Sequence, residues 1–386
     1  MGQTVRVAVV RHDNRRAAVA GALALIADDL AARVGPEVLV KPNLVSHKAQ
    51  LPSTHADALG ATLDAVFAAG AGRVTVAEGA TDATAGFDRF GFRREAAGRP
   101  VRFFDINRDE DGWEPLRLTA VDGRPLFARL SRTVTGSACR VSLALAKTHV
   151  TSIVTLGLKN MLSSLHPDDR VMMHGHAGGG NGYAGWRRLA VEFLKQDNLL
   201  VNAATRLLGR VGNARSAWRW SRCKGDPFRA LTRAELGYLR TVEAMNRNLA
   251  ALARKTRPHV SVVDGFLGMH REGPRHGTPI RLGTVIAGTD PVAVDAVAAS
   301  VMGFDPRQIG YLVYAQGAGI GVADLDRITV VGDPVAAVRR RFVPHSNDPV
   351  QRHWHRLDES SARGPHFAPA AAGADADADA GKVGAR

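Results

Sequence analysis

The sequence is poor in cysteine, in aromatic residues and in long apolar runs. Its 386 residues include only two cysteines, Cys139 and Cys223. Two thiols are too few for a four-thiolate zinc or iron–sulfur site, or for a disulfide framework. No apolar run reaches the about 18 residues of a membrane-spanning helix, and the first residues lack the charged and then apolar layout of a signal peptide. We therefore expect a cytoplasmic protein with no iron–sulfur cluster and no membrane span.

Acidic residues are scarce relative to basic ones. The chain has 51 Lys or Arg against 37 Asp or Glu, a formal net charge of +14. Residues 177–257 hold much of this surplus, with 16 Lys or Arg against 5 Asp or Glu. Such a segment is typical of a solvated, arginine-rich helical face. It would equally suit contact with nucleic acid, an anionic membrane or an acidic partner, and these alternatives stay open.

Apolar, β-branched runs alternate with helical patterns along most of the chain. This alternation predicts an α/β fold with a largely parallel sheet and flanking helices. The expected strands are 4–10, 37–40, 73–77, 101–104, 140–146, 259–264, 283–288 and 327–332, and a hairpin is expected over 115–130. The expected helices are 17–34, 56–70, 151–165, 291–303 and 308–319. Asp290-Pro291 is a good start for the fourth of these helices.

The alternation is interrupted once. Residues 177–257 open with a glycine-rich stretch and continue as basic, mostly helical sequence. We expect this segment to be an insertion between a first part of the α/β core, 1–176, and a second part, 258–342. The low-complexity tail, 360–386, is expected to be disordered.

Polar side chains follow several of the expected strands. Lys41 and Asn43 come after one strand, Lys147 and His149 after another, and Asp264 ends a third. The carboxyl ends of parallel strands meet at one edge of a sheet, where ligands bind, so we expect these groups to share a cleft. The plainer alternative is that each strand simply ends in a polar loop. In a cleft, burial would lower the pKa of a lysine and make it a base or nucleophile, whereas a charged lysine would bind a carboxylate or phosphate.

Histidines and glycines add further candidates. His149, His174 and His176 have side chains that can bind a divalent metal, and His149 could instead be a general base. Hydrogen-bonded loop histidines without a metal are the plainer interpretation. Gly273 belongs to a glycine-rich loop after a strand, where backbone N–H groups can approach an anion.

Taken together, these segments resemble the protein family called domain of unknown function 362. The matching stretches are VLVKPNL (38–44), Thr54 with the helix after it, AKTHVTSIVTLGLKNML (146–162), Arg170 with His174, DGFLGMHREGPRHGTP (264–279) and AGTDPVAVDAVAASVMGFDP (287–306). Many members of that family carry ferredoxin-type cysteine motifs and are labelled iron–sulfur proteins. This chain has no such motif, so that label is not transferred.

The chain also resembles, more weakly, the nickel-dependent lactate racemase superfamily. There a histidine transfers protons, a lysine ten residues later bears a nickel-pincer nucleotide, and a histidine about 16 residues further on ligates nickel. Here Lys159 follows His149 by ten residues, and His174 follows Lys159 by fifteen. The chain has TLGLKN where that superfamily is glycine-rich. His174 therefore lies one residue away from the position that the nickel-ligating histidine occupies in that superfamily.

We therefore expect an enzyme that acts on a small anionic, carboxylated metabolite by proton transfer, as in isomerisation, racemisation or elimination. The candidate catalytic residues are Lys147, His149 and Lys159. The candidate substrate-binding residues are Lys41, Asn43, Thr54, Asn160, Arg170, Asp264 and Gly273, and the candidate metal ligands are His174 and His176. One alternative is a non-enzymatic binding protein that docks nucleic acid or an acidic partner through 177–257, and another is a redox-associated protein. No pattern in the sequence bears on the oligomeric state.

Overall fold

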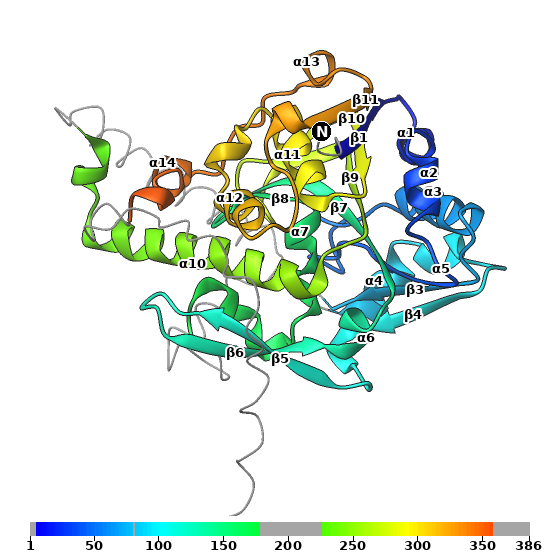
Figure 1. The fold of residues 1–386 in the computed structure, drawn as a ribbon, viewed down its shortest axis with the longest axis horizontal. Helices are drawn as coiled ribbons and strands as arrows, with labels where there is room; N and C mark the ends of the chain where they lie inside the picture. The colour runs from blue at the N-terminus through cyan, green and yellow to red at the C-terminus, as the bar shows by residue number, and fades with distance from the viewer. Residues whose placement is uncertain (1–4, 80–81, 178–225, 358–386) are drawn as a thin grey trace, which may run out of the picture.

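A nine-stranded mixed sheet forms the centre of the molecule, seen in Figure 1. The computed structural model describes residues 5–79, 82–177 and 226–357. The strand order is β11-β1-β10-β9-β7-β2-β3-β4, with β8 paired to β7. These strands are β1 (Val5–Arg11), β2 (Glu37–Lys41), β3 (Arg73–Glu78), β4 (Val101–Asp105), β7 (Cys139–His149), β8 (Ile153–Thr155), β9 (Val260–His270), β10 (Thr278–Gly288) and β11 (Ile328–Gly332). The pairs β1–β10, β10–β9 and β7–β8 are antiparallel and the others are parallel, so the predicted α/β class and largely parallel sheet are confirmed.

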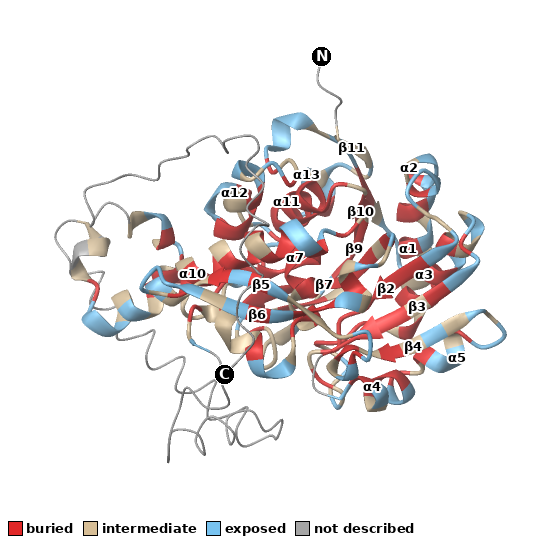
Figure 2. Ribbon diagram, turned by 60° about the horizontal axis from the view of Figure 1, so that its bottom comes forward, coloured by how far each residue is buried: buried red, intermediate tan, exposed pale blue. Residues whose placement is uncertain are grey.

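Alternating side chains divide the interior into two apolar layers, one on each face of the sheet. In β2, for example, Val38 and Val40 join one buried cluster and Leu39 joins the other, because successive residues of a strand point to opposite faces. Figure 2 shows the central strands β2, β3, β7, β9 and β10 as mostly buried. One face packs against α1 (Arg15–Ala24), α2 (Ala27–Ala31), α3 (Ala56–Ala68), α4 (Ala83–Arg89) and α5 (Phe92–Glu95). The other packs against α7 (Gly157–Asn160), α10 (Arg233–Thr256), α11 (Pro291–Val301), α12 (Gly310–Gly317) and α13 (Val335–Val338).

All eleven residues of helix α11 are buried. The Asp290 side chain accepts hydrogen bonds from the backbone N–H groups of Val292 (2.9 Å) and Ala293 (3.0 Å), and Pro291 occupies the first turn. This is the start that the sequence predicts. The expected helix over 308–319 is also present, as α12.

Two expected helices differ from the structure. The prediction of one helix over 151–165 is wrong: the segment forms β8, the short α7 and a 3-10 turn over Met161–Ser164. The β-branched residues before Leu156 pair with the end of β7 instead, in keeping with the strand preference of such residues. The helix expected over 17–34 is interrupted, because Ile26 has a non-helical backbone (φ −120°, ψ 26°) between α1 and α2.

The expected hairpin is confirmed as β5 (Trp113–Thr119) and β6 (Pro125–Ser131), with Gly123 in the left-handed region of the turn (φ +87°). It forms a separate two-stranded sheet beside α10 (Figure 1). Asn248 of α10 fastens it, accepting from the Thr119 N–H (2.8 Å) and donating to the Thr119 carbonyl (2.9 Å).

The expected basic insertion is described only from residue 226 onward. Its long helix, α10, begins with a capping box between Thr232 and Glu235 and buries Met245, Leu249 and Leu252 in the core. Residues 178–225 and the tail 360–386 lie outside the described part, so a nucleic-acid or acidic partner for 177–257, and disorder in the tail, stay predictions. None of the described helices is both long and apolar enough to span a membrane.

Short elements complete the described chain. They are η1 (Ile106–Arg108), α6 (Arg132–Thr135), η2 (Met161–Ser164), η3 (Pro167–His174), η4 (Pro227–Ala230), η5 (Pro306–Gln308), η6 (Leu325–Arg327), α14 (Asp348–Gln351) and η7 (Trp354–Arg356).

Candidate active site

The order in which the chain adds strands to the sheet reverses between β2 and β7. From β2 the chain adds β3 and β4 on one side, and it later returns to add β7 and β9 on the other. Such a switch point leaves a crevice at the carboxyl ends of the two strands. A cavity of about 190 Å³ lies there. It is lined by Asn43, Val45, His149, Thr155, Lys159, Asn160, Leu162, Ser163, Arg170, Pro274 and Arg275.

Lys41 lies beneath this cavity in a buried ion pair. Its Nζ is 3.0 Å from both carboxylate oxygens of Glu78, at the end of β3. Glu78 also accepts hydrogen bonds from the Leu44 and Gly79 N–H groups (3.1 and 2.7 Å) and from the Ser163 hydroxyl. Burial lowers the pKa of Lys41. Burial alone would raise the pKa of Glu78, but the charge of Lys41 and the hydrogen bonds leave it lowered. Lys41 is therefore engaged by the protein and is not among the residues that line the cavity.

Three polar side chains brace the crevice. Thr54 Oγ1 accepts from the Asn43 N–H (2.8 Å) and donates to the Leu143 carbonyl (3.2 Å). Asn43 Nδ2 donates to Asn160 Oδ1 (3.0 Å), and Asn160 Nδ2 donates to the Lys41 carbonyl (3.0 Å). These bonds join the end of β2, the start of α3, β7 and α7. Asn43 and Asn160 also line the cavity, whereas Thr54 does not.

Two buried lysines differ in what their amines contact. Lys147 is 0% exposed, and its Nζ donates to Asn43 Oδ1 (2.5 Å) and to the Pro52 carbonyl (2.9 Å). Lys159 is 7% exposed and lines the cavity, and its amine has no hydrogen bond or ion pair to any described residue. Burial lowers the pKa of both lysines to about 7, and the charge of Lys159 adds to the effect on Lys147. Lys159 is thus the amine that a ligand would meet.

His149 presents a hydrogen-bond donor to the cavity. Its Nδ1 accepts the Thr151 N–H (3.0 Å), so the neutral ring carries its proton on Nε2. Burial and the charge of Lys159 hold the pKa of His149 well below its usual range, which keeps the ring neutral. In this tautomer His149 can donate to a ligand oxygen. A role as general base would need the other tautomer and stays a prediction.

The cavity wall is basic. Arg170 is held by the Asn107 side chain (2.7 Å) and by the carbonyls of Ser163 (3.2 Å) and Leu165 (3.1 Å), and burial lowers its pKa. Arg275 lines the same cavity from the β9–β10 connection. No Asp or Glu belongs to the described lining. The Thr155 hydroxyl is buried there without a hydrogen-bond partner in the described chain.

Besides Lys41 and Thr54, two more of the expected substrate-binding residues lie off the cavity. Asp264 is fully buried and pairs with Arg15 Nε (3.1 Å) at the start of α1, and burial raises the pKa of this carboxyl. Gly273 packs against β7, because an added Cβ would lie 2.1 Å from the Thr148 carbonyl oxygen. Its two successors, Pro274 and Arg275, reach the cavity.

The two expected metal ligands lie near the end of η3. Burial and the charge of Lys159 lower the pKa of His174 to about 3, and His176 Nε2 lies 3.4 Å from Thr241 Oγ1. Within the described ranges no three His, Cys, Asp or Glu side chains gather closely enough to hold a metal ion. These side chains form no ready-made metal centre, and a metal held by His174 or His176 stays a prediction.

Sequence reasoning missed two residues whose hydrogen bonds fix the backbone at His149 and before Lys159. Gln351 donates to the His149 carbonyl (3.0 Å) and to the Tyr238 hydroxyl (2.9 Å), and no motif marks it. Asp295 is a buried residue of α11. It accepts the Gly157 N–H (2.7 Å) and the Leu158 N–H (3.1 Å), so it fixes the turn that carries Lys159.

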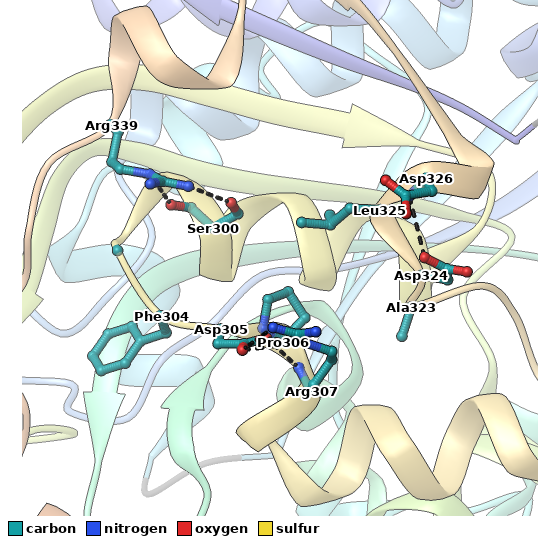
Figure 3. A pocket seen from close by; sticks show the side chains of 11 residues that line it. Ser300, Phe304, Asp305, Pro306, Arg307, Ala323, Asp324, Leu325, Asp326 and Arg339 are labelled. Carbon is teal, nitrogen blue, oxygen red and sulfur yellow. Dashed lines mark hydrogen bonds and ion pairs between the residues drawn. The ribbon is translucent and has the colours of Figure 1, made fainter.

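A larger cavity, of about 410 Å³, lies beyond the end of α11 (Figure 3). Its charged side chains contact one another or the backbone: Arg307 pairs with Asp305 (2.8 Å), and Arg339 donates to the carbonyl and hydroxyl of Ser300 (both 3.1 Å). No histidine or lysine is among the described residues that line it. The chemistry therefore points to the smaller cavity.

Comparisons with known proteins place the chain in a family. One match among solved structures is the lactate racemase apoprotein from Thermoanaerobacterium thermosaccharolyticum, with 15% identity and a TM-score of 0.32. The match covers 45% of this chain and 41% of that protein, and so weak a likeness carries no argument about function. No curated protein matches. The model of the domain of unknown function DUF362 matches residues 38–300, which include every candidate site residue; the chain belongs to the DUF362 family.

Proposed function

We propose that this protein is an enzyme that binds a small carboxylate in the cavity between β2 and β7 and transfers a proton at a carbon near that carboxylate. The reaction would be an isomerisation, racemisation or elimination. The observation that carries the proposal is the buried amine of Lys159, which has no partner in the described chain. The described lining of its cavity holds two arginines and no carboxylate.

The basic wall supports an anionic ligand. Arg170 and Arg275 can donate charge-assisted hydrogen bonds to a carboxylate, and such bonds are stronger than neutral ones. Competing carboxylates are absent from the described lining, and Glu78 beneath it is already occupied by Lys41. At about 190 Å³ the cavity is smaller than the roughly 300–1,000 Å³ of drug-sized sites. The ligand is therefore a small molecule.

The remaining groups support proton transfer. A lysine whose pKa is lowered to about 7 has a lone pair available near neutral pH, which suits acid–base chemistry best when the pKa is close to the working pH. The Nε2–H of His149 can donate to a ligand oxygen on which negative charge develops. Both groups sit on braced elements, since Asp295 fixes the Lys159 turn and Gln351 binds the His149 carbonyl.

A solvent-exchange experiment tests the proposal. The full-length protein is incubated in D₂O with a panel of small 2-hydroxy, 2-oxo and unsaturated carboxylates, and proton NMR follows the loss of each C–H signal. We expect catalysed exchange for at least one compound, its loss in Lys159→Met, and its retention in the control Lys255→Met, which changes an exposed lysine in α10. Full exchange by Lys159→Met would remove Lys159 from the reaction.

A further inference from the structure

The proposed function leaves one question about Lys159: whether its nitrogen takes a proton from the ligand or forms a bond to a carbon atom of the ligand. We propose that the nitrogen bonds to a carbon atom, and that Lys159 forms an imine with a small 2-oxo carboxylate. The inference rests on the proposed function, because it uses the same cavity, and it narrows the substrate class to carboxylates with a neighbouring carbonyl group.

The two buried lysines supply the first argument. Lys147 and Lys159 are both buried, yet Lys147 is not among the lining residues, and its Nζ donates to Asn43 Oδ1 and to the Pro52 carbonyl. The amine of Lys159 lines the cavity with no partner in the described chain. An amine that only shuttles protons gains from a hydrogen-bonded neighbour that orients it and passes the proton on. A nucleophilic amine needs an open lone pair and an adjacent cavity.

The lining groups supply the second argument. A 2-oxo acid offers only acceptors, namely two carboxylate oxygens and one carbonyl oxygen. The cavity lining offers hydrogen-bond donors: the guanidinium groups of Arg170 and Arg275 and the Nε2–H of His149. A donor to the carbonyl oxygen makes its carbon more electrophilic. Burial also favours the uncharged amine of Lys159, and desolvation is one of the recognised ways of activating a lysine nucleophile.

The step balances without a co-reactant. The Nζ lone pair adds to the carbonyl carbon, and the carbonyl π electrons move to oxygen. Both amine hydrogens then leave with that oxygen as water, and a C=N bond joins Lys159 to the ligand. Once protonated, this imine withdraws electrons from the next carbon and makes its hydrogens acidic. The proton transfer of the proposed function would follow from imine formation.

Reductive trapping tests the inference on the full-length protein. The probe is pyruvate with cyanoborohydride, which reduces an imine to a stable amine, and the product is read by intact mass and peptide mapping. We expect one adduct, equal in mass to pyruvic acid less one oxygen atom, on Lys159. Lys147 is an internal control, because its pKa is lowered to the same value while its amine is enclosed. Lys159→Arg keeps a cation but cannot form the adduct, and propanoate lacks the carbonyl.

The outcomes separate the inference from the function it rests on. Labelling at Lys159 that is lost in Lys159→Arg supports the imine. Labelling at Lys147, or equal labelling at the exposed Lys48 and Lys255, overturns it. No adduct also overturns it; if the same preparation still catalyses deuterium exchange into a carboxylate, the proposed function survives. If exchange is absent as well, both fall.

Discussion

Replacing Lys159 by methionine should make the protein more stable, although it removes the reactive group of the proposed site. Methionine has a similar length and no charge to desolvate. In the native protein the amine is buried without a partner among the described residues, so the folded state disfavours its protonated form. The methionine variant has no charge at this position, so its folding does not include the free-energy cost of burying or deprotonating the amine.

The magnitude follows from the lowered pKa. A change from 10.5 to about 7 is roughly 3.5 pKa units, and at about 1.4 kcal/mol per unit it corresponds to roughly 5 kcal/mol. Part of this gain is offset by imperfect packing of the new side chain, which costs about 1 kcal/mol in a volume-conserving exchange. We expect Lys159→Met to raise the free energy of unfolding by about 2–5 kcal/mol at pH 7.

The pH dependence distinguishes this cause from a general packing effect. Between about pH 7 and 10.5 the unfolded chain binds more protons at this lysine than the folded chain, so wild-type stability rises with pH. The gain of the variant is therefore largest below pH 7 and vanishes towards pH 10.5. Urea titrations of both proteins from pH 6 to 10 measure it, and a difference that does not change with pH would refute the reasoning.

Lys147→Met is the matched control. It removes a lysine with the same lowered pKa, but it leaves Asn43 Oδ1 and the Pro52 carbonyl buried without their donor. Each orphaned acceptor costs about 1–3 kcal/mol. We therefore expect this variant to gain less stability than Lys159→Met, or to lose stability. Equal gains in both variants would contradict the contrast between an open and an enclosed amine.

Three further predictions address the rest of the site. Glu78→Gln leaves the Lys41 charge buried and unpaired, so urea titration at pH 7 should show a loss of about 3–5 kcal/mol; a loss below 1 kcal/mol would mean that Lys41 is neutral. Arg275→Gln removes a charge-assisted donor worth about 1.5–3 kcal/mol, so calorimetry should show propanoate binding weakened roughly tenfold or more, and unchanged affinity would place the carboxylate elsewhere. Burial raises the pKa of Asp295 to about 7; the folded state then binds more protons than the unfolded state from about pH 4 to 7, and stability falls over that range. Asp295→Asn should reduce this fall, and identical slopes would contradict the assignment.

The pattern of strands and polar strand ends was accessible from the sequence because it is local. Each strand is marked by its own β-branched run, and the residue after each run follows directly. The rule that parallel strands present their carboxyl ends at one edge therefore predicts the neighbourhood of Lys41, Lys147 and His149. It does not predict which lysine is open, because Asn43 and Pro52, far away in the chain, decide that Lys147 is enclosed.

The segment over 151–165 could not be interpreted correctly from its own residues. Its apolar spacing suits a helix, yet Ile153, Val154 and Thr155 pair back onto β7. Gly157 then fits a close contact in which an added Cβ would lie 2.1 Å from Ser261 Oγ. Tertiary pairing overrides local propensity here. Gln351 was equally hidden, since it meets His149 across 202 positions of chain.

The contact of Gln351 with His149 has a consequence for the order of events during synthesis. The family match ends at residue 300, and Arg275 is the last residue of the described cavity lining to be synthesised. The side chain that holds the His149 carbonyl is made later still, with α14. All strands of the sheet, through β11, also precede Gln351 in the chain. The His149 carbonyl therefore gains this hydrogen bond only after every residue of the described cavity lining has been synthesised.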